Sequence, residues 1–241
     1  MREIICGLYI ALYTWLTAPL RYRPKKERDE KAMKIGHAKN YKMAQRLCRG
    51  ILKITGAKLN IQGEENLPYK GTAVYMGTHK SYMDIVIMVA LVDEPLIFIG
   101  KSEVDKLPFI RTWFKAIGGI YMDREDIRQS FRVILEAIGE LKKGYSVAIF
   151  PEGTRAKGKE MIEFKAGSFK LATKANVPIV PIVMQDTFKL LEEKRRVRPG
   201  KIEVNVGKVI DVPNLTKEER HTISRDTQRY MQTLLNKMSE N

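Results

Sequence analysis

From Gly56 onward, short β-rich runs alternate with helical stretches, and this alternation constrains the fold more than any other feature of the chain. Strands are predicted at residues 58–62, 72–78, 95–99, 119–122, 146–150, 179–184 and 202–211. Helices are predicted at residues 82–91, 102–116, 127–142, 164–174 and 217–238. Strands that alternate with helices form parallel sheets covered by helices. The sequence therefore predicts an α/β fold with a largely parallel central sheet flanked by helices.

The size of the chain suits one domain with a complete core, since 44% of its 241 residues are hydrophobic. We divide it into a helical N-terminal segment, residues 1–55, and an α/β domain, residues 56–241. Cys6 and Cys48 do not resemble a disulfide framework in a chain of this length, which favours a reducing, cytoplasmic compartment.

Residues 4–20 are apolar and uncharged, a little short of the roughly 20 residues that span a bilayer, and Pro19 interrupts their end. A cleaved signal peptide is disfavoured, because the start is nearly neutral and the segment ends in a poor cleavage site. Two alternatives remain: an interfacial anchor, or a single span whose following basic cluster keeps the domain cytoplasmic. Both place the chain at the cytoplasmic face of the cell membrane.

A basic amphipathic helix is predicted between residues 28 and 54, where lysines and arginines flank apolar positions at helical spacing. The apolar positions are Met33, His37, Met43, Leu47, Ile51 and Ile54. Residues 21–53 hold twelve basic and three acidic residues, much of the net charge of +15. Such a helix can lie on anionic lipid and form a membrane-associated pair with the first helix. The alternative is a solvated helix that packs on the domain.

His79 and Asp84 stand where the predicted strand 72–78 gives way to a helix. Within one helix, their five-residue offset would turn them about 140° apart. If His79 instead precedes the helix and Asp84 lies in its first turn, the carboxylate can orient the imidazole while the other ring nitrogen acts as a base. A substrate hydroxyl would then serve as nucleophile. The alternative is structural, because Ser81 and Asp84 also match a helix capping box.

A tight turn with Glu152, Gly153, Thr154 and Arg155 follows the predicted strand 146–150. A guanidinium at a strand end is a good bidentate ligand for phosphate, and the N–H groups of a glycine turn can add donors. The alternative is an ordinary surface loop.

Lys101 and Arg124 each follow another predicted strand, so both could join Arg155 around one phosphate. Arg124 could equally form a surface ion pair with its neighbour Asp123.

These segments, in this order, resemble the 1-acylglycerol-3-phosphate acyltransferase family over about residues 60–207. The matching motifs are His-x4-Asp at residues 79–84, a glycine-rich strand ending in arginine at 118–124, Glu-Gly-Thr-Arg at 152–155 and a Val-Pro-x-x-Pro-like strand at 177–181. One departure is Gly118-Gly119, where many members of the family carry Gly-Pro or Gly-Ala.

The resemblance implies that His79, oriented by Asp84, deprotonates the sn-2 hydroxyl of lysophosphatidic acid, which attacks an acyl thioester and gives phosphatidic acid. It also implies a set of glycerophosphate ligands: Glu152, Gly153, Thr154, Arg155, Arg124 and Lys101. The acyl donor would be a cosubstrate on coenzyme A or acyl carrier protein. We expect no cofactor, and no metal, because the histidines and cysteines lack ligand spacing. The chain has no room for the extra domains of glycerol-3-phosphate acyltransferases, which favours the second acylation.

Three rival functions remain. The acceptor could be another lysolipid, or the chain could be a non-enzymatic basic protein that binds nucleic acid or coats membranes. The sequence shows no helix-turn-helix and no RNA-binding aromatic signature, so the expected partners are lipids and the acyl donor rather than nucleic acid. A serine hydrolase using Ser81 or Ser168 is disfavoured because the chain lacks a Gly-x-Ser-x-Gly elbow.

Overall fold

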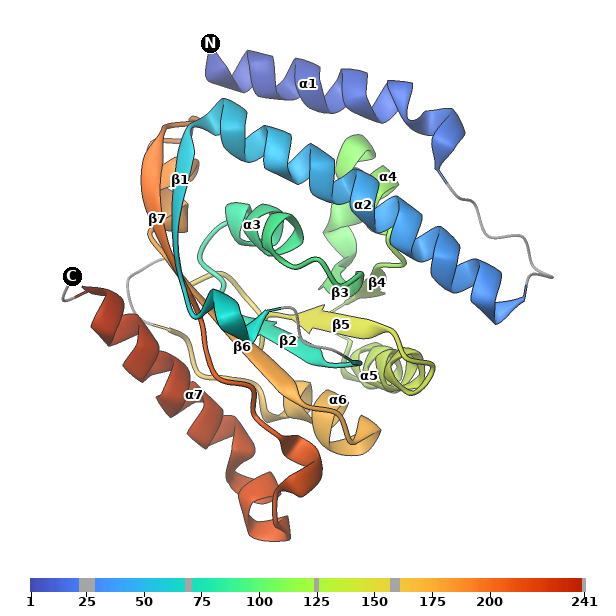
Figure 1. Cartoon of the computed structure of the whole chain (residues 1–241), viewed down its shortest axis with the longest axis vertical. Coiled ribbons are helices and arrows are strands. Elements are labelled where there is room, and N and C mark those ends of the chain that lie inside the picture. Colours follow the sequence, from blue (N-terminus) through green and yellow to red (C-terminus); the bar gives the residue numbers. More distant parts are fainter. Residues whose placement is uncertain (22–28, 68–70, 124–125, 157–160, 240–241) are drawn as a thin grey trace.

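The computed structural model describes residues 1–21, 29–67, 71–123, 126–156 and 161–239, and its centre is one seven-stranded sheet (Figure 1). The strands are β1 (Ala57–Gln62), β2 (Val74–Gly77), β3 (Leu96–Lys101), β4 (Ile120–Met122), β5 (Ser146–Ile149), β6 (Ile179–Gln185) and β7 (Gly200–Val206). Their order is β1-β7-β6-β2-β5-β3-β4, and every neighbouring pair is parallel except β6 and β7. The predicted α/β fold with a largely parallel sheet is confirmed.

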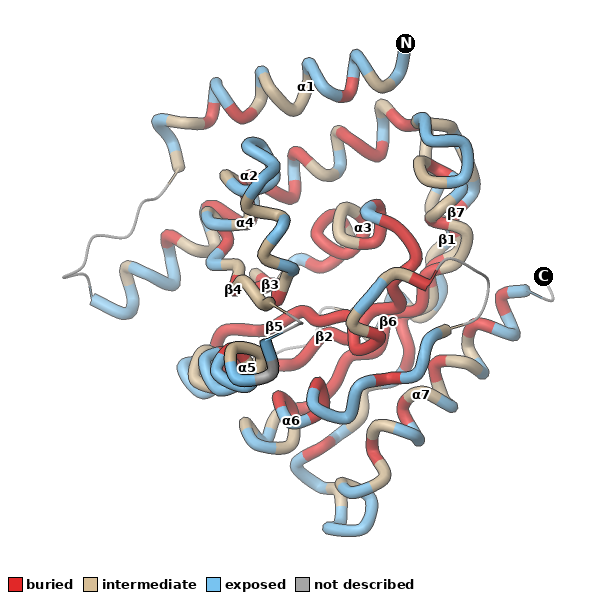
Figure 2. Tube along the Cα trace, turned by 180° about the vertical axis from the view of Figure 1, so that it is seen from behind, coloured by how far each residue is buried: buried red, intermediate tan, exposed pale blue. Residues whose placement is uncertain are grey.

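Helices cover both faces of this sheet (Figure 1). They are α1 (Arg2–Leu16), α2 (Glu30–Thr55), α3 (Met83–Leu91), α4 (Pro108–Ala116), α5 (Ile127–Lys142), α6 (Ala166–Ala175) and α7 (Lys217–Ser239). Short 3-10 helices lie at Ala18–Leu20, Glu64–Asn66, Ser102–Lys106, Thr187–Leu190 and Val212–Asn214. One apolar core lies between the sheet and helices α1, α2, α3 and α4. A second core lies between the sheet and helices α5, α6 and α7. Figure 2 shows the central strands β2, β5 and β6 almost wholly buried.

Three predicted elements have different bounds in the structure. The predicted helix 102–116 is divided into a 3-10 helix and α4 at Pro108, because proline disfavours helical backbone in the residue before it. The predicted helix 164–174 begins only at Ala166, because the backbone of Lys165 is extended (φ −72°, ψ 113°). The predicted strand 202–211 ends at Val206, and only an isolated bridge at Ile210 continues the pairing.

Most of the apolar face of α2 packs against the domain, and only Met33 at its start is exposed. Tyr41, Met43, Leu47 and Ile51 are all buried in the core shared with the sheet. Nε2 of His37, the polar member of the predicted apolar face, lies 3.0 Å from the carbonyl oxygen of Ile117. Of the two alternatives for this helix, the one that the structure shows is packing on the domain.

Helix α1 has two apolar faces. One packs on α2 and α4, where the Tyr13 hydroxyl donates to the carbonyl of Met43 (3.0 Å) and the Trp113 indole donates to Thr14 (2.9 Å). The opposite face bears an exposed apolar stripe, here defined as Ile4, Leu8, Leu12 and Trp15. Within the part of the chain that the structure describes, no helix is both long and apolar enough to cross a membrane.

Candidate active site

The predicted site residues gather at one edge of the sheet. Because β2, β5 and β3 are parallel neighbours, their carboxyl ends meet at the same edge, where ligands bind in open α/β folds. This edge carries His79 after β2, Arg155 after β5 and Lys101 at the end of β3. The ammonium of Lys101 pairs with Glu103, and Arg124 lies outside the described residues.

His79 and Asp84 are in contact as the predicted geometry requires. His79 precedes α3, Asp84 lies in its first turn, and Nδ1 of the imidazole is 3.0 Å from Oδ2 of the carboxylate. When Nδ1 donates its hydrogen to Asp84, Nε2 keeps a lone pair and can accept a proton. The same Oδ2 accepts the N–H groups of Lys80 (2.6 Å) and Ser81 (2.7 Å). The carboxylate therefore orients the histidine and also caps the turn.

The turn after β5 holds His79 by its backbone and by its ring. The N–H of His79 donates to Oε1 of Glu152 (2.7 Å), and its carbonyl oxygen accepts the N–H of Ala156 (2.7 Å). The imidazole stacks on Phe150 with ring centroids 4.3 Å apart. Contacts at the backbone and on the ring face leave His79 few alternative orientations.

Glu152 faces the interior, which differs from its expected place among the phosphate ligands. Its side chain is buried, and Oε2 accepts the N–H of Ile162 (3.1 Å) while Oε1 serves His79. Burial raises the pKa of Glu152 to about 7, although these two N–H groups oppose the shift. In this structure the Glu152 carboxylate is enclosed, and its hydrogen bonds support the backbone of His79.

Arg155 lies beside the turn that carries His79. Its guanidinium stacks over the ring of Tyr82, with Cζ 3.9 Å from the ring centroid, and Nη1 is 3.3 Å from Oε1 of Glu192. Thr154 is exposed next to it. Gly153 has φ +72°, a left-handed backbone conformation that favours glycine at this position of the turn.

Sequence reasoning assigned no role to Tyr82 or Glu192, yet both contact Arg155. Glu192 belongs to the segment after β6, which carries none of the predicted motifs. The feature of this segment that could have indicated a functional residue is the acidic pair Glu192-Glu193 beside the basic run 194–196.

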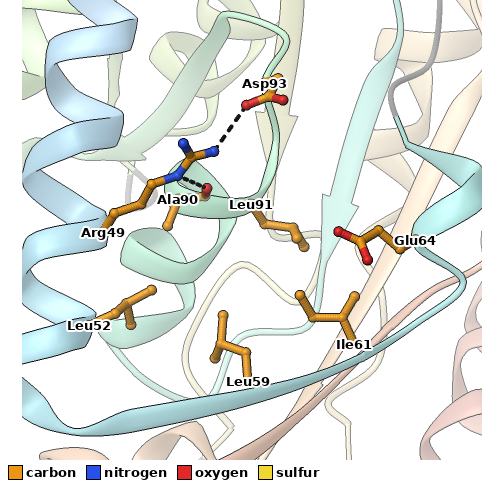
Figure 3. A pocket seen from close by; sticks show the side chains of 8 residues that line it. All are labelled: Arg49, Leu52, Leu59, Ile61, Glu64, Ala90, Leu91 and Asp93. Atoms are coloured by element: carbon orange, nitrogen blue, oxygen red, sulfur yellow. Dashed lines mark hydrogen bonds and ion pairs between the residues drawn. The ribbon is translucent and has the colours of Figure 1, made fainter.

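A cavity of about 360 Å³ lies away from this edge, between α2, β1 and the far end of α3 (Figure 3). It is lined by Arg49, Leu52, Leu59, Ile61, Glu64, Ala90, Leu91 and Asp93. Asp84 stands about 10 Å further along α3 from Leu91, given the helical rise per residue. The cavity is therefore separate from the candidate active site.

The fold and the site together define an α/β enzyme with a carboxylate-oriented histidine beside a fixed guanidinium. The family model described as "Acyltransferase" matches residues 58–185, which include both groups. The chain belongs to this acyltransferase family, which confirms the enzyme class that the motifs predicted and argues against the hydrolase and non-enzymatic alternatives.

Two curated relatives support this assignment. A 1-acyl-sn-glycerol-3-phosphate acyltransferase of Borreliella burgdorferi is 30% identical over 183 residues, which cover 74% of this chain and 73% of the relative. The enzyme of the same description from Escherichia coli is 28% identical over 165 residues, covering 68% of this chain and 67% of the relative.

The fold also matches a solved structure. The crystal structure of the 1-acyl-sn-glycerophosphate acyltransferase of Thermotoga maritima aligns with a TM-score of 0.72 at 24% identity. The alignment covers 100% of this chain and 97% of that chain, and it shows that the two share their fold.

Proposed function

We propose that this enzyme transfers a fatty acyl group from an acyl thioester to the sn-2 hydroxyl of 1-acylglycerol-3-phosphate, giving phosphatidic acid for phospholipid synthesis. The observation that carries the proposal is the 3.0 Å contact between Nδ1 of His79 and Asp84, which prepares Nε2 to act as a base. The choice of 1-acylglycerol-3-phosphate as the acceptor is based on the names of the relatives, which are 1-acyl-sn-glycerol-3-phosphate acyltransferases.

In the proposed reaction, Nε2 of His79 removes the proton of the acceptor hydroxyl as its oxygen attacks the thioester carbonyl. The buried carboxylate of Asp84 stabilises the imidazolium that forms. The tetrahedral intermediate then collapses, the C–S bond breaks, and the carrier thiolate takes the proton from the imidazolium. No covalent acyl-enzyme is formed, because the substrate itself supplies the nucleophile.

Arg155 is the proposed ligand for the acceptor's phosphate. A guanidinium can bind a phosphate with two parallel hydrogen bonds, and its stacking on Tyr82 places it next to the turn that carries His79. Gly153, Thr154, Lys101 and Arg124 remain proposed additional ligands at the same edge. Holding the phosphate there would bring the hydroxyl to the base and lower the entropic part of the barrier.

We further propose that α1 attaches the enzyme to the cytoplasmic face of the membrane. The apolar stripe of Ile4, Leu8, Leu12 and Trp15 is suited to the boundary between headgroups and acyl chains. The exposed basic residues Lys42, Arg46 and Lys53 on neighbouring α2 are suited to anionic headgroups. Interfacial attachment would give the active site access to an acceptor that stays in the leaflet.

Acylation by purified protein in mixed micelles tests the proposed substrates. Lysophosphatidic acid and lysophosphatidylethanolamine are compared as acceptors, each with acyl coenzyme A and with acyl carrier protein as donor. We expect thioester-dependent phosphatidic acid and release of one thiol per acyl group transferred, with at least one carrier. Preference for lysophosphatidylethanolamine would contradict the proposed acceptor and favour a lysolipid without a phosphate monoester.

A further inference from the structure

We propose that Glu192 is a positioning residue for acyl transfer, whose carboxylate fastens the turn carrying His79 to the guanidinium of Arg155. The inference rests on the proposed function, because it concerns how the base and the phosphate ligand keep their relative places. It adds a residue from the segment after β6, which none of the predicted motifs includes.

The carboxylate of Glu192 joins two parts of the site that are far apart in the sequence. Oε2 accepts the hydroxyl hydrogen of Ser81 (2.7 Å), and Oε1 accepts the N–H of Tyr82 (2.9 Å). Oε1 also lies 3.3 Å from Nη1 of Arg155. One side chain thus contacts both the turn after β2 and the turn after β5.

On the side of the base, Glu192 acts through Ser81. The N–H of Ser81 donates to Oδ2 of Asp84 (2.7 Å), the same oxygen that is bonded to His79. The hydroxyl of Ser81 accepts the N–H of Met83 (2.9 Å) while it donates to Glu192. Displacement of Ser81 would therefore alter the environment of the oxygen that orients the imidazole.

On the side of the phosphate ligand, Glu192 limits the freedom of a long side chain. The guanidinium of Arg155 lies over the ring of Tyr82, its Nη2 is 3.3 Å from the Tyr82 hydroxyl, and its Nη1 faces Glu192. Arginine has five N–H donors, so these contacts leave others for a bound anion. A guanidinium fixed before the substrate arrives loses less rotamer entropy on binding.

The segment that carries Glu192 is itself held in place. The N–H of Glu192 donates to the carbonyl of Phe188 (2.9 Å), and the N–H of Arg198 donates to that of Leu190 (2.8 Å). Leu190 is fully buried, and the N–H of Val197 donates to Glu3 of α1 (2.9 Å). A side chain can position its neighbours only when its own backbone is fixed, and this segment meets that condition.

If Glu192 served stability alone, its removal would lower activity only by unfolding the protein. The Arg155–Glu192 pair is partly exposed, with side-chain exposures of 35% and 25%, and such ion pairs stabilise proteins little. Loss of the ion pair alone should therefore change the melting temperature little. The hydrogen bonds of Ser81 and Tyr82 to the same carboxylate add to stability, so the kinetics of each variant are compared at a temperature where it is fully folded.

The test compares Glu192→Ala, Glu192→Gln and the matched control Glu193→Ala in the acylation assay, together with melting temperatures. Glu193 is the exposed neighbour of Glu192, and its carboxylate forms no hydrogen bond or ion pair with the described residues. We expect Glu192→Ala to lower kcat about tenfold or more and to raise KM for lysophosphatidic acid, while KM for the thioester stays unchanged. Glu192→Gln, whose amide can still bond to Ser81 and Tyr82, should recover most of kcat. Glu193→Ala should match the wild type.

Kinetics of Glu192→Ala equal to those of Glu193→Ala, in the presence of an active wild type, would overturn this inference and leave the proposed function standing. A loss of activity in proportion to unfolded protein would overturn it as well, since it would show a role in stability alone. A wild type that does not acylate lysophosphatidic acid would instead remove the proposed function, and this inference with it.

Discussion

At the scale of single residues, the least expected group of the site is the enclosed carboxyl of Glu152. Burial raises its pKa to about 7, so between its ordinary value and pH 7 the folded chain keeps a proton that the unfolded chain has released. Unfolding therefore releases a proton in this window, and the contribution of Glu152 to stability falls as the pH rises through it. The contribution is largest below the window.

The substitution Glu152→Gln removes this titration and tests the sign of its effect. The difference in melting temperature between the variant and the wild type should shift in favour of the variant between pH 5 and pH 8, whatever its value at pH 5. Thermal denaturation monitored by circular dichroism at several pH values measures this shift. A difference that does not change with pH would show that Glu152 is ionised throughout.

Contacts within one short segment of the site can be predicted from the sequence, whereas contacts between distant segments cannot. The contact of His79 with Asp84 follows from a five-residue offset across the start of a helix, so one segment suffices to predict it. The inward orientation of Glu152 depends on backbone groups of His79 and Ile162, from other parts of the chain. Glu192 reaches the site from a third segment, and no local pattern predicts where a partner so distant in sequence will lie.

At the scale of elements, α1 carries the proposed attachment to the membrane. Leu8 lies in the middle of its apolar stripe and is 65% exposed. A carboxylate there would have to leave water when the helix enters the interface, so Leu8→Glu should lower the fraction of protein bound to lipid vesicles. Its melting temperature should change little, because the side chain does not belong to the core. Vesicle sedimentation measures binding.

Leu135→Glu is the matched control for this prediction. Leu135 is 51% exposed on α5, a helix that packs on the opposite face of the sheet from α1, so the same change of charge there should leave vesicle binding intact. Equal losses of binding in the two variants would contradict attachment through α1.

Patterns in the sequence predict single strands and helices, but they do not predict how these elements pack together. All seven predicted strands form, but their sequences differ in kind. The buried strand β6 is rich in β-branched residues, whereas the outermost strand β1 has only Ile61 of this kind and follows an alternation of half-buried and exposed positions. The amphipathic pattern of α2 predicts a helix with one apolar face but cannot tell whether protein or lipid covers that face. The strand order and the antiparallel pairing of β6 with β7 depend on contacts between distant segments.

At the scale of the whole molecule, the net charge of +15 should act together with α1. Binding to vesicles that contain phosphatidylglycerol should weaken as salt rises, because the screening length falls from about 10 Å at 0.1 M to about 3 Å at 1 M. Binding should not vanish, since the apolar stripe is insensitive to screening. Cosedimentation over this range of salt measures the effect, and binding that salt does not change would argue against anionic lipid as a partner.

The central claim is that a histidine at the sheet edge performs base catalysis on a substrate hydroxyl. The most direct test is the rate of phosphatidic acid formation by His79→Ala, with His221→Ala, an exposed histidine on α7, as the control. We predict that His79→Ala lowers kcat by on the order of a hundredfold or more while His221→Ala behaves as wild type. A folded His79→Ala variant that keeps a kcat close to that of wild type would contradict the mechanism.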